Sequence, residues 1–314
     1  MGHFSQDLCS YSLIAFGTDE YPRLPYGGIP EPDLLIATNN QCGTTLLWFQ
    51  LLAQKKNIPL FVIDYPSVAG DQDTVQPYVI EQYESLINFV QQHTNGQLDN
   101  RMLSQQVASS RETCKLWEQV HQLNQISSIA IEADQLVNAL FPIVVAKGQQ
   151  SAADYYRSLL NEHRQSEKAE CSDVVRLLWH GYPMWFLSSK FPKSFGENFK
   201  IVLNDYTLWW NLDYGDSDDD MKSLAKAYSA TYLNWPLDKK ISWTRQLVDQ
   251  FSIDGVICHA NRSCRRALAD IVPVRTVLSE IKIPSTVIES DMANPEFYSE
   301  EQVKLRIESL KDMF

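Results

Sequence analysis

Two cysteines in this sequence have equivalent local surroundings and could bind the same metal centre. Cys42 follows the strand-like run DLLIAT and a polar turn, and Cys264 follows GVICHA and the turn Asn261-Arg262-Ser263. Each cysteine stands at the start of a helix-like segment. A helix N-terminus presents N–H groups and partial positive charge, which stabilise thiolates and a negatively charged iron–sulfur cluster. The residues alone leave open that these are ordinary half-buried thiols.

A third thiol is expected, because a cluster with two protein ligands would be weakly held. Cys9, in the segment LCSYS, is the natural choice, since the chain after it leads into the strand before Cys42. Three cysteines leave one iron of a four-iron cluster without a protein thiol, and such an open position suits direct substrate chemistry.

The three remaining cysteines show no partner motif. Cys258 lies inside an apolar strand and is expected in the core, whereas Cys114 and Cys171 are expected to be ordinary thiols. No CxxC pair occurs, which argues against a zinc ribbon or a thioredoxin-type site. Six cysteines without a signal peptide also argue against disulfides and for a cytoplasmic protein.

Composition limits the partners. The formal net charge of −12 and the absence of a basic stripe argue against nucleic acid. No apolar stretch approaches the roughly 18 residues of a membrane helix, so we expect a soluble chain that does not enter a membrane. Its 314 residues are enough for two domains.

A short helix is expected over residues 7–16. The elements after it, which must position these thiols, follow an alternating pattern. DLLIAT, the segment CGTTLLWFQLLAQKK and IPLFVIDYP read as strand, helix and strand, a unit that requires a parallel sheet. Residues 77–164 have helical periodicity, and four further strands follow in DVVRLLWHG, FKIVLND, DGVICHA and PSTVIES. The predicted fold class is α/β, with two doubly wound, Rossmann- or flavodoxin-like parallel-sheet domains and a helical insertion. The predicted domains are 1–165 and 166–314, because the polar stretch NEHRQSEKAECSD lies at their boundary.

The segment IDGVICHANRSCRR resembles the DGVI-x-H-S-N-R-S-C-K signature of the 2-hydroxyacyl-CoA dehydratase and benzoyl-CoA reductase family. VVRLLWHGYPMWF, YLNWPLDKKISWTRQLVDQFSIDG and ESDMANPEFYSEEQVKLRIESL are similar to other stretches of that family, and LCSYS and TNNQCG to its first two cysteine segments. The resemblance covers nearly the whole chain and is strongest from Val174 onward.

The resemblance implies an iron–sulfur subunit of a heterodimer of two similar subunits. Each would bind a 4Fe-4S cluster through three cysteines, which are here Cys9, Cys42 and Cys264. An ATP-dependent iron–sulfur activator would deliver single electrons, and a CoA thioester would lose water through a ketyl radical. The electron would then be returned, so that the reaction would cause no net redox change. Candidate residues around the cluster or the substrate are His259, Asn261, Arg262, Ser263 and Arg265.

Three positions differ from the family pattern: Ala260 replaces a serine, Arg265 a lysine and Gly43 a frequent aspartate. The family also usually carries an additional N-terminal segment. The alternatives therefore stay open: a benzoyl-CoA reductase-type subunit, a homodimeric double-cubane-type reductase, or a non-catalytic structural or electron-relay subunit.

Some residues near the strand ends have no assigned role. Trp209 and Trp210 could line an acyl pocket or pack in the core. His259 could be a hydrogen-bonded structural histidine rather than part of the site. Asp205 and Glu289 follow strand ends, where a carboxylate could be useful.

Overall fold

The computed structural model describes residues 5–20, 30–66, 72–125, 131–165, 174–187 and 198–314. The chain forms two compact units, each assembled from two stretches of sequence. The first unit contains residues 1–107 and 213–235, and the second contains residues 108–212 and 236–314. Across the described residues, no helix combines the length and apolar character needed to cross a membrane.

The second unit is built on a four-stranded parallel sheet with the order β4-β3-β5-β6. These strands are β3 (Val175–His180), β4 (Phe199–Asn204), β5 (Gly255–Asn261) and β6 (Ser285–Ser290). The chain passes from β3 to β4 on one side and then returns to place β5 on the other side of β3. In a sheet of this kind, ligands bind at the carboxyl ends of the strands beside such a reversal, so the ends of β3 and β5 mark the expected site.

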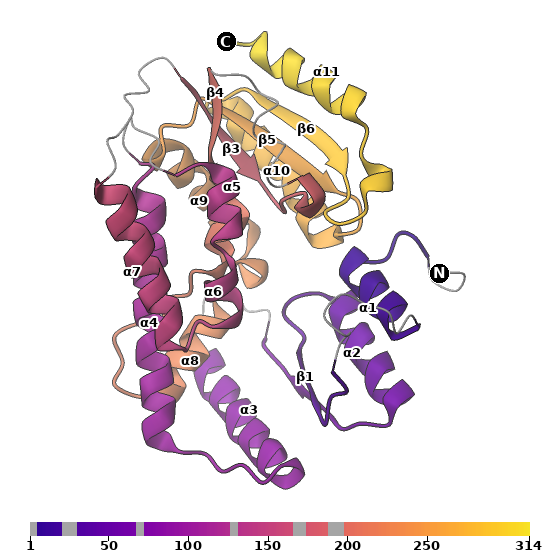
Figure 1. The fold of residues 1–314 in the computed structure, drawn as a ribbon, viewed down its shortest axis with the longest axis vertical. Coiled ribbons are helices and arrows are strands. Elements are labelled where there is room, and N and C mark those ends of the chain that lie inside the picture. The colour runs from indigo at the N-terminus through magenta and orange to yellow at the C-terminus, as the bar shows by residue number, and fades with distance from the viewer. Residues whose placement is uncertain (1–4, 21–29, 67–71, 126–130, 166–173, 188–197) are drawn as a thin grey trace. The chain divides into compact units, whose positions relative to one another are not determined.

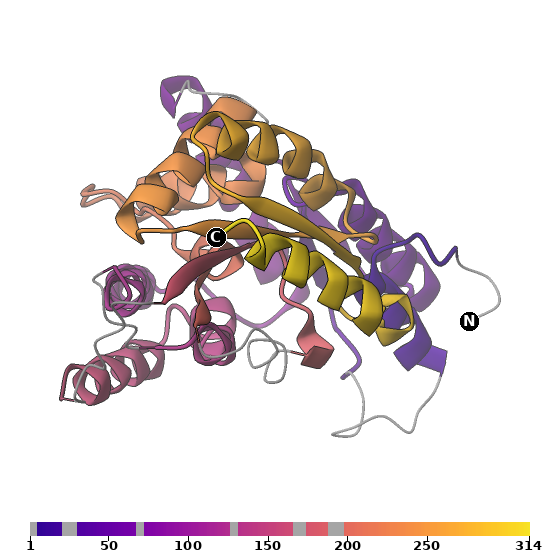
Figure 2. The same cartoon turned by 90° about the horizontal axis from the view of Figure 1, so that it is seen from above.

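Helices cover both faces of this sheet (Figures 1 and 2). On one face, α9 (Leu237–Gln250) and α10 (Arg265–Glu280) bury an apolar core against β3, β4 and β5. On the other face, α5 (Ala133–Asn138) and α11 (Glu300–Lys311) bury a second core. Alternate residues of β3 and β5 supply the two cores, as the two-residue period of a strand requires. In β4, Val202 and Leu203 both join the first core, beside a shift in the register between β3 and β4.

Further helices of the second unit pack around the buried rings of Trp117 and Tyr156. These helices are α6 (Phe141–Val145), α7 (Gln150–Gln165) and most of α4 (Asn100–Gln122). The second unit also contains the short turns η2 (Trp185–Leu187), η4 (Asp205–Trp210) and η6 (Pro295–Phe297).

The first unit contains the parallel pair β1 (Leu35–Thr38) and β2 (Leu60–Ile63), joined by α2 (Gly43–Lys56). Its other elements are α1 (Ser10–Glu20), α3 (Gln72–His93), the start of α4, α8 (Asp220–Ser229) and η5 (Tyr232–Asn234). Helix α2 ends at Asn57, which adopts the left-handed conformation with φ 54°. Asparagine tolerates this conformation better than most residues.

The α/β fold class with parallel sheets is confirmed, as is the strand–helix–strand unit around Cys42. The helix predicted near the N-terminus from residue 7 begins instead at Ser10 and runs to Glu20, because the carbonyl of Cys9 accepts the first helical bond, from Leu13 N–H. The predicted domain boundary falls beside residues 166–173, which lie outside the described residues, and it stays a prediction.

Candidate functional site

The turn before Cys264 is fixed by the side chain and carbonyl of Asn261. This residue is fully buried at the end of β5, and its Oδ1 accepts hydrogen bonds from Met292 N (3.2 Å) and Ser263 Oγ (3.3 Å). Its carbonyl accepts from Cys264 N at 3.1 Å. The Arg262 N–H donates to the carbonyl of Ser290 at 2.9 Å, which joins the turn to the end of β6. The turn therefore sets the position at which α10 begins.

Cys264 is the N-cap residue of α10. Its backbone is extended, with φ −120° and ψ 94°, and its carbonyl accepts from Leu268 N at 3.1 Å. Its side chain makes no capping hydrogen bond to the helix. The thiol is partly exposed and outside any disulfide.

Cys42 is the N-cap residue of α2, and here the sulfur does cap the helix. Its Sγ accepts from Thr45 N at 3.3 Å and lies 3.1 Å from Thr45 Oγ1. The sulfur is thus surrounded by a backbone N–H and a hydroxyl, the groups that stabilise negative charge on a thiolate.

Cys9 directly precedes the first residue of α1. Its carbonyl accepts from Leu13 N at 3.0 Å and from Ser12 Oγ at 2.7 Å, so it too stands where a helix begins. Cys9 and Cys42 belong to the first unit and Cys264 to the second. Their convergence on one cluster stays a prediction.

The donor set fits a thiolate-ligated iron–sulfur cluster. All three cysteines are partly exposed and outside disulfides, and each stands next to the N–H groups of a helix start. Thiolates are the ligands that such clusters take. Within the part of the chain that the structure describes, no three His, Cys, Asp or Glu side chains are gathered that could hold a metal ion.

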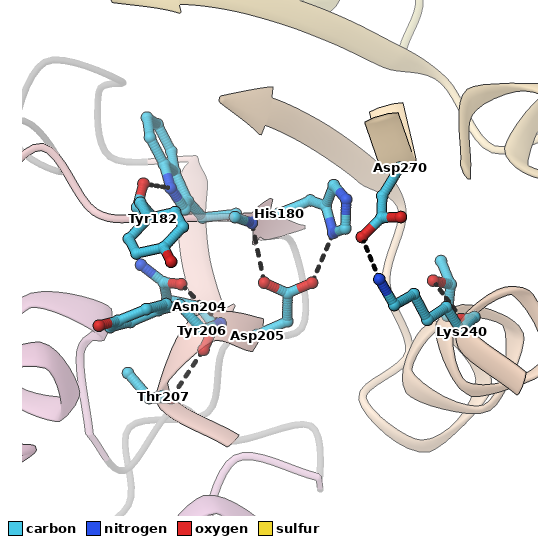
Figure 3. Close-up of polar contacts among 11 residues, drawn as sticks. His180, Tyr182, Asn204, Asp205, Tyr206, Thr207, Lys240 and Asp270 are labelled. Atoms are coloured by element: carbon cyan, nitrogen blue, oxygen red, sulfur yellow. Dashed lines mark hydrogen bonds and ion pairs between the residues drawn. The ribbon is translucent and has the colours of Figure 1, made fainter. Parts of the chain in front are cut away.

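A buried histidine–aspartate pair lies at the carboxyl ends of β3 and β4 (Figure 3). His180 Nδ1 donates to Asp205 Oδ2 at 2.5 Å, and the Gly181 N–H donates to Asp205 Oδ1 at 2.8 Å. Burial disfavours the imidazolium, but the charge of Asp205 and its hydrogen bond outweigh this and raise the pKa of His180 above its ordinary value. Gly181 has φ +99°, a conformation that favours glycine. The pair therefore joins the ends of β3 and β4 and fixes the turn after β3.

A second buried ion pair stands beside the first (Figure 3). Lys240 Nζ of α9 lies 2.7 Å from Asp270 Oδ2 of α10. Both residues are nearly inaccessible to solvent, and both act electrostatically on His180. The pair joins the two helices on the face of the sheet toward which His180 points.

His259 points to the opposite face of the sheet. Its Nδ1 donates to the carbonyl of Tyr182 at 2.7 Å, which leaves Nε2 as the unprotonated nitrogen of the neutral ring. Burial lowers the pKa of His259 to about 4, so the ring is neutral at pH 7. The histidine is a hydrogen-bonded part of the core that joins the signature strand β5 to the turn after β3.

The remaining predicted residues have different surroundings. The guanidinium of Arg262 lies 3.6 Å from the centre of the Phe297 ring, whereas Arg265 is exposed on the first turn of α10. Trp209 and Trp210 pack against Tyr206 in an aromatic cluster after β4.

The other cysteines differ from the three candidates. Cys258 is buried, as expected for a core thiol, and burial raises its pKa to about 12. Cys114, which was expected to be an ordinary thiol, is buried as well. Cys171 lies outside the described residues.

Sequence reasoning named Asp205 without a role and missed His180. Both residues end predicted strands, which was the one signal in the sequence. Their pairing depends on β3 and β4 being neighbours in the sheet, and the strand order supplies that fact.

The fold and the thiols define an α/β protein with cysteines at helix starts beside parallel strands. The family model of the 2-hydroxyglutaryl-CoA dehydratase D-component matches residues 1–314, and the chain belongs to this family. The chain is 23% identical over 333 residues to the alpha subunit of lactoyl-CoA dehydratase of Anaerotignum propionicum, covering 99% of this chain and 79% of that protein. It is 26% identical to the (R)-2-hydroxyisocaproyl-CoA dehydratase alpha subunit of Clostridioides difficile, covering 99% and 78%. It is 25% identical to a benzoyl-CoA reductase subunit of Thauera aromatica, covering 99% and 77%.

Proposed function

We propose that this chain is the iron–sulfur subunit of a 2-hydroxyacyl-CoA dehydratase-like enzyme, which removes water from a CoA thioester. The observation that carries the proposal is the position of three thiols, each immediately before the first residue of a helix, in a chain of the dehydratase family. The names of the dehydratase relatives support the substrate class, since each names a CoA thioester.

Cys9, Cys42 and Cys264 would hold a 4Fe-4S cluster. When bound, such a cluster supplies single electrons and a Lewis-acidic iron at its position without a thiolate. The chain's own residues hold the ligands in place: Thr45 donates to the sulfur of Cys42, and Asn261 fixes the turn before Cys264.

The partners follow from the same proposal. The dehydratase and reductase relatives are named as single subunits of enzymes with more than one subunit, which supports a homologous second subunit for this chain. Elimination through a ketyl radical needs an electron of low potential. The chain contains no G-x-x-x-x-G-K-[ST] motif for ATP binding, so a separate ATP-dependent iron–sulfur activator would supply this electron.

Metal analysis of anaerobically purified chain tests the proposal. We expect about four iron and four sulfide per chain, as a 4Fe-4S cluster requires, and loss of both in Cys264→Ala. The matched control is Cys114→Ala, which removes a buried thiol of the same unit and should retain iron. A colourless wild-type chain, or a Cys264→Ala chain with full iron, would contradict the proposal.

A second candidate is a reductase subunit, because the similarity to the benzoyl-CoA reductase relative is of the same order as the similarity to the dehydratases. Product analysis separates the two. A dehydratase forms an enoyl-CoA with no net consumption of electrons, whereas a reductase consumes electrons in proportion to product. A holoprotein that does neither with any partner would favour an electron-relay subunit.

A further inference from the structure

We propose that His180 and Asp205 form a redox-linked proton site, which binds a proton when an electron is added near Cys264 and releases it when the electron leaves. The inference rests on the proposed function, because the added electron is the one that the proposed 4Fe-4S cluster would hold. It assigns a role to a buried pair that the ligand set does not use.

The geometry is that of a built proton site. His180 and Asp205 are 3% and 1% exposed, and both carboxylate oxygens of Asp205 are engaged, one by His180 and one by the Gly181 N–H. The bond at Nδ1 fixes the tautomer, so Nε2 is the nitrogen that gains or loses the proton. Asp205 directly follows the end of β4 and is the first residue of η4.

The surrounding charges favour proton uptake. The formal charges of Asp205, Asp270 and Lys240 sum to −1 while His180 is neutral, and they become balanced when His180 is protonated. Cys258, opposite His180 in the sheet register, is a neutral thiol because burial raises its pKa to about 12. Among these described groups, His180 is thus the one whose ordinary pKa lies near neutral pH.

Two elements connect the surroundings of His180 to Cys264: β5, whose Cys258 is paired with His180, and α10, whose Asp270 acts electrostatically on it. Cys258 precedes the end of β5 at Asn261 by three residues, about 10 Å along a strand. Asp270 follows Cys264 by six residues, about 9 Å along α10. Over such distances, charges in a partly buried site still interact measurably. An added electron therefore raises the proton affinity of His180.

The step balances. On reduction, one electron arrives from the activator and up to one proton from solvent binds Nε2. When the electron is returned after the elimination, the proton returns to solvent, so the catalytic cycle consumes neither.

The test is the pH dependence of the midpoint potential of the cluster, measured by EPR-monitored titration of the holoprotein. The wild-type potential should become more negative as pH rises. It should become nearly independent of pH in His180→Gln, which keeps a donor for Asp205 and cannot bind the proton. Asp205→Asn should weaken the dependence.

The matched control is His121→Gln. His121 is another buried histidine of the second unit. Burial lowers its pKa to about 4, so its ring is neutral around pH 7. Its replacement should leave the pH dependence of the wild type intact. An identical slope in wild type and His180→Gln, with equal iron content, overturns the inference and leaves the proposed function standing.

A second measurement uses the metal-free chain. The imidazole NMR signal that disappears in His180→Gln identifies His180 among the six histidines. This signal should titrate above the ordinary histidine value, and a ring that stays neutral from pH 5 upward contradicts the proposal. A wild-type chain that binds no iron overturns the proposed function and the redox link together.

Discussion

Cys42 and Cys264 stand at the same place in two similar local structures, yet the two helix starts are stabilised differently. The sulfur of Cys42 caps α2 by accepting from Thr45 N, whereas the side chain of Cys264 makes no capping bond to α10. In α10, the turn before the helix is instead held by Asn261.

The two helices also differ in how many of their side chains are buried. Residues 43–56, all of them described, include no fully buried side chain, whereas α10 buries six residues against the sheet of the second unit. One of the six is Asp270, which pairs with Lys240 of α9. Local capping thus holds the start of α2, and tertiary packing holds α10. A cysteine at a helix start can be positioned by either route.

The largest expected effect tests the packing of α10. Asp270→Asn leaves Lys240 as a buried charge without its carboxylate, so we expect a loss of about 3–5 kcal/mol in the free energy of unfolding. Denaturant unfolding followed by tryptophan fluorescence measures this loss.

The control lies on the same helix. Glu280→Gln breaks the exposed pair with Arg245, and we expect a change of less than about 1 kcal/mol. Equal effects of the two substitutions would show that the buried pair does not hold α10.

A smaller effect should separate the two cysteines in the metal-free chain. Cys42→Ala removes a capping acceptor, which costs about 1 kcal/mol for ordinary caps, whereas Cys264→Ala removes no cap. Hydrogen exchange of the first-turn amides should therefore speed up in α2 for the first substitution and change little in α10 for the second. Equal acceleration in both helices would show that the two helix starts are not stabilised differently.

The smallest effect concerns the charge on the Cys42 sulfur in the holoprotein. Thr45→Val removes the hydroxyl near Sγ but keeps the backbone N–H, so the midpoint potential should become more negative, because hydrogen bonds to cluster sulfurs favour the reduced state.

Two controls accompany this substitution. Thr45→Ser should restore the potential, because it retains the hydroxyl. Thr44→Val, at the preceding position of α2, should leave the potential unchanged. A Thr45→Val potential equal to that of the wild type would contradict a role for the hydroxyl.

Local pattern was sufficient for much of the fold. The strands on both sides of Cys42 and the end of α2 at Asn57 were predicted, because apolar runs and a helix end at asparagine are local features. The start of α1 was placed three residues early, since helix ends depend on which carbonyl accepts the first bond.

The site was only partly predictable. Asp205 could be placed at a strand end, but its partner His180 precedes it by 25 residues along the chain. Nothing in the spacing of these two residues indicates a contact. His259 could be read as either a site residue or a structural one, and its bond to Tyr182 now accounts for its burial.

The sequence by itself determined the parallel α/β class, the positions of Cys42 and Cys264 at helix starts and the family signature, because each depends on residues close together in the chain. Only the tertiary structure decided the order of β3, β4 and β5 and the partners of His180, Lys240 and Asp270. Sheet order depends on how the helices cross over the sheet and pack on its two faces. A buried charge is stable only where that packing provides its counter-charge.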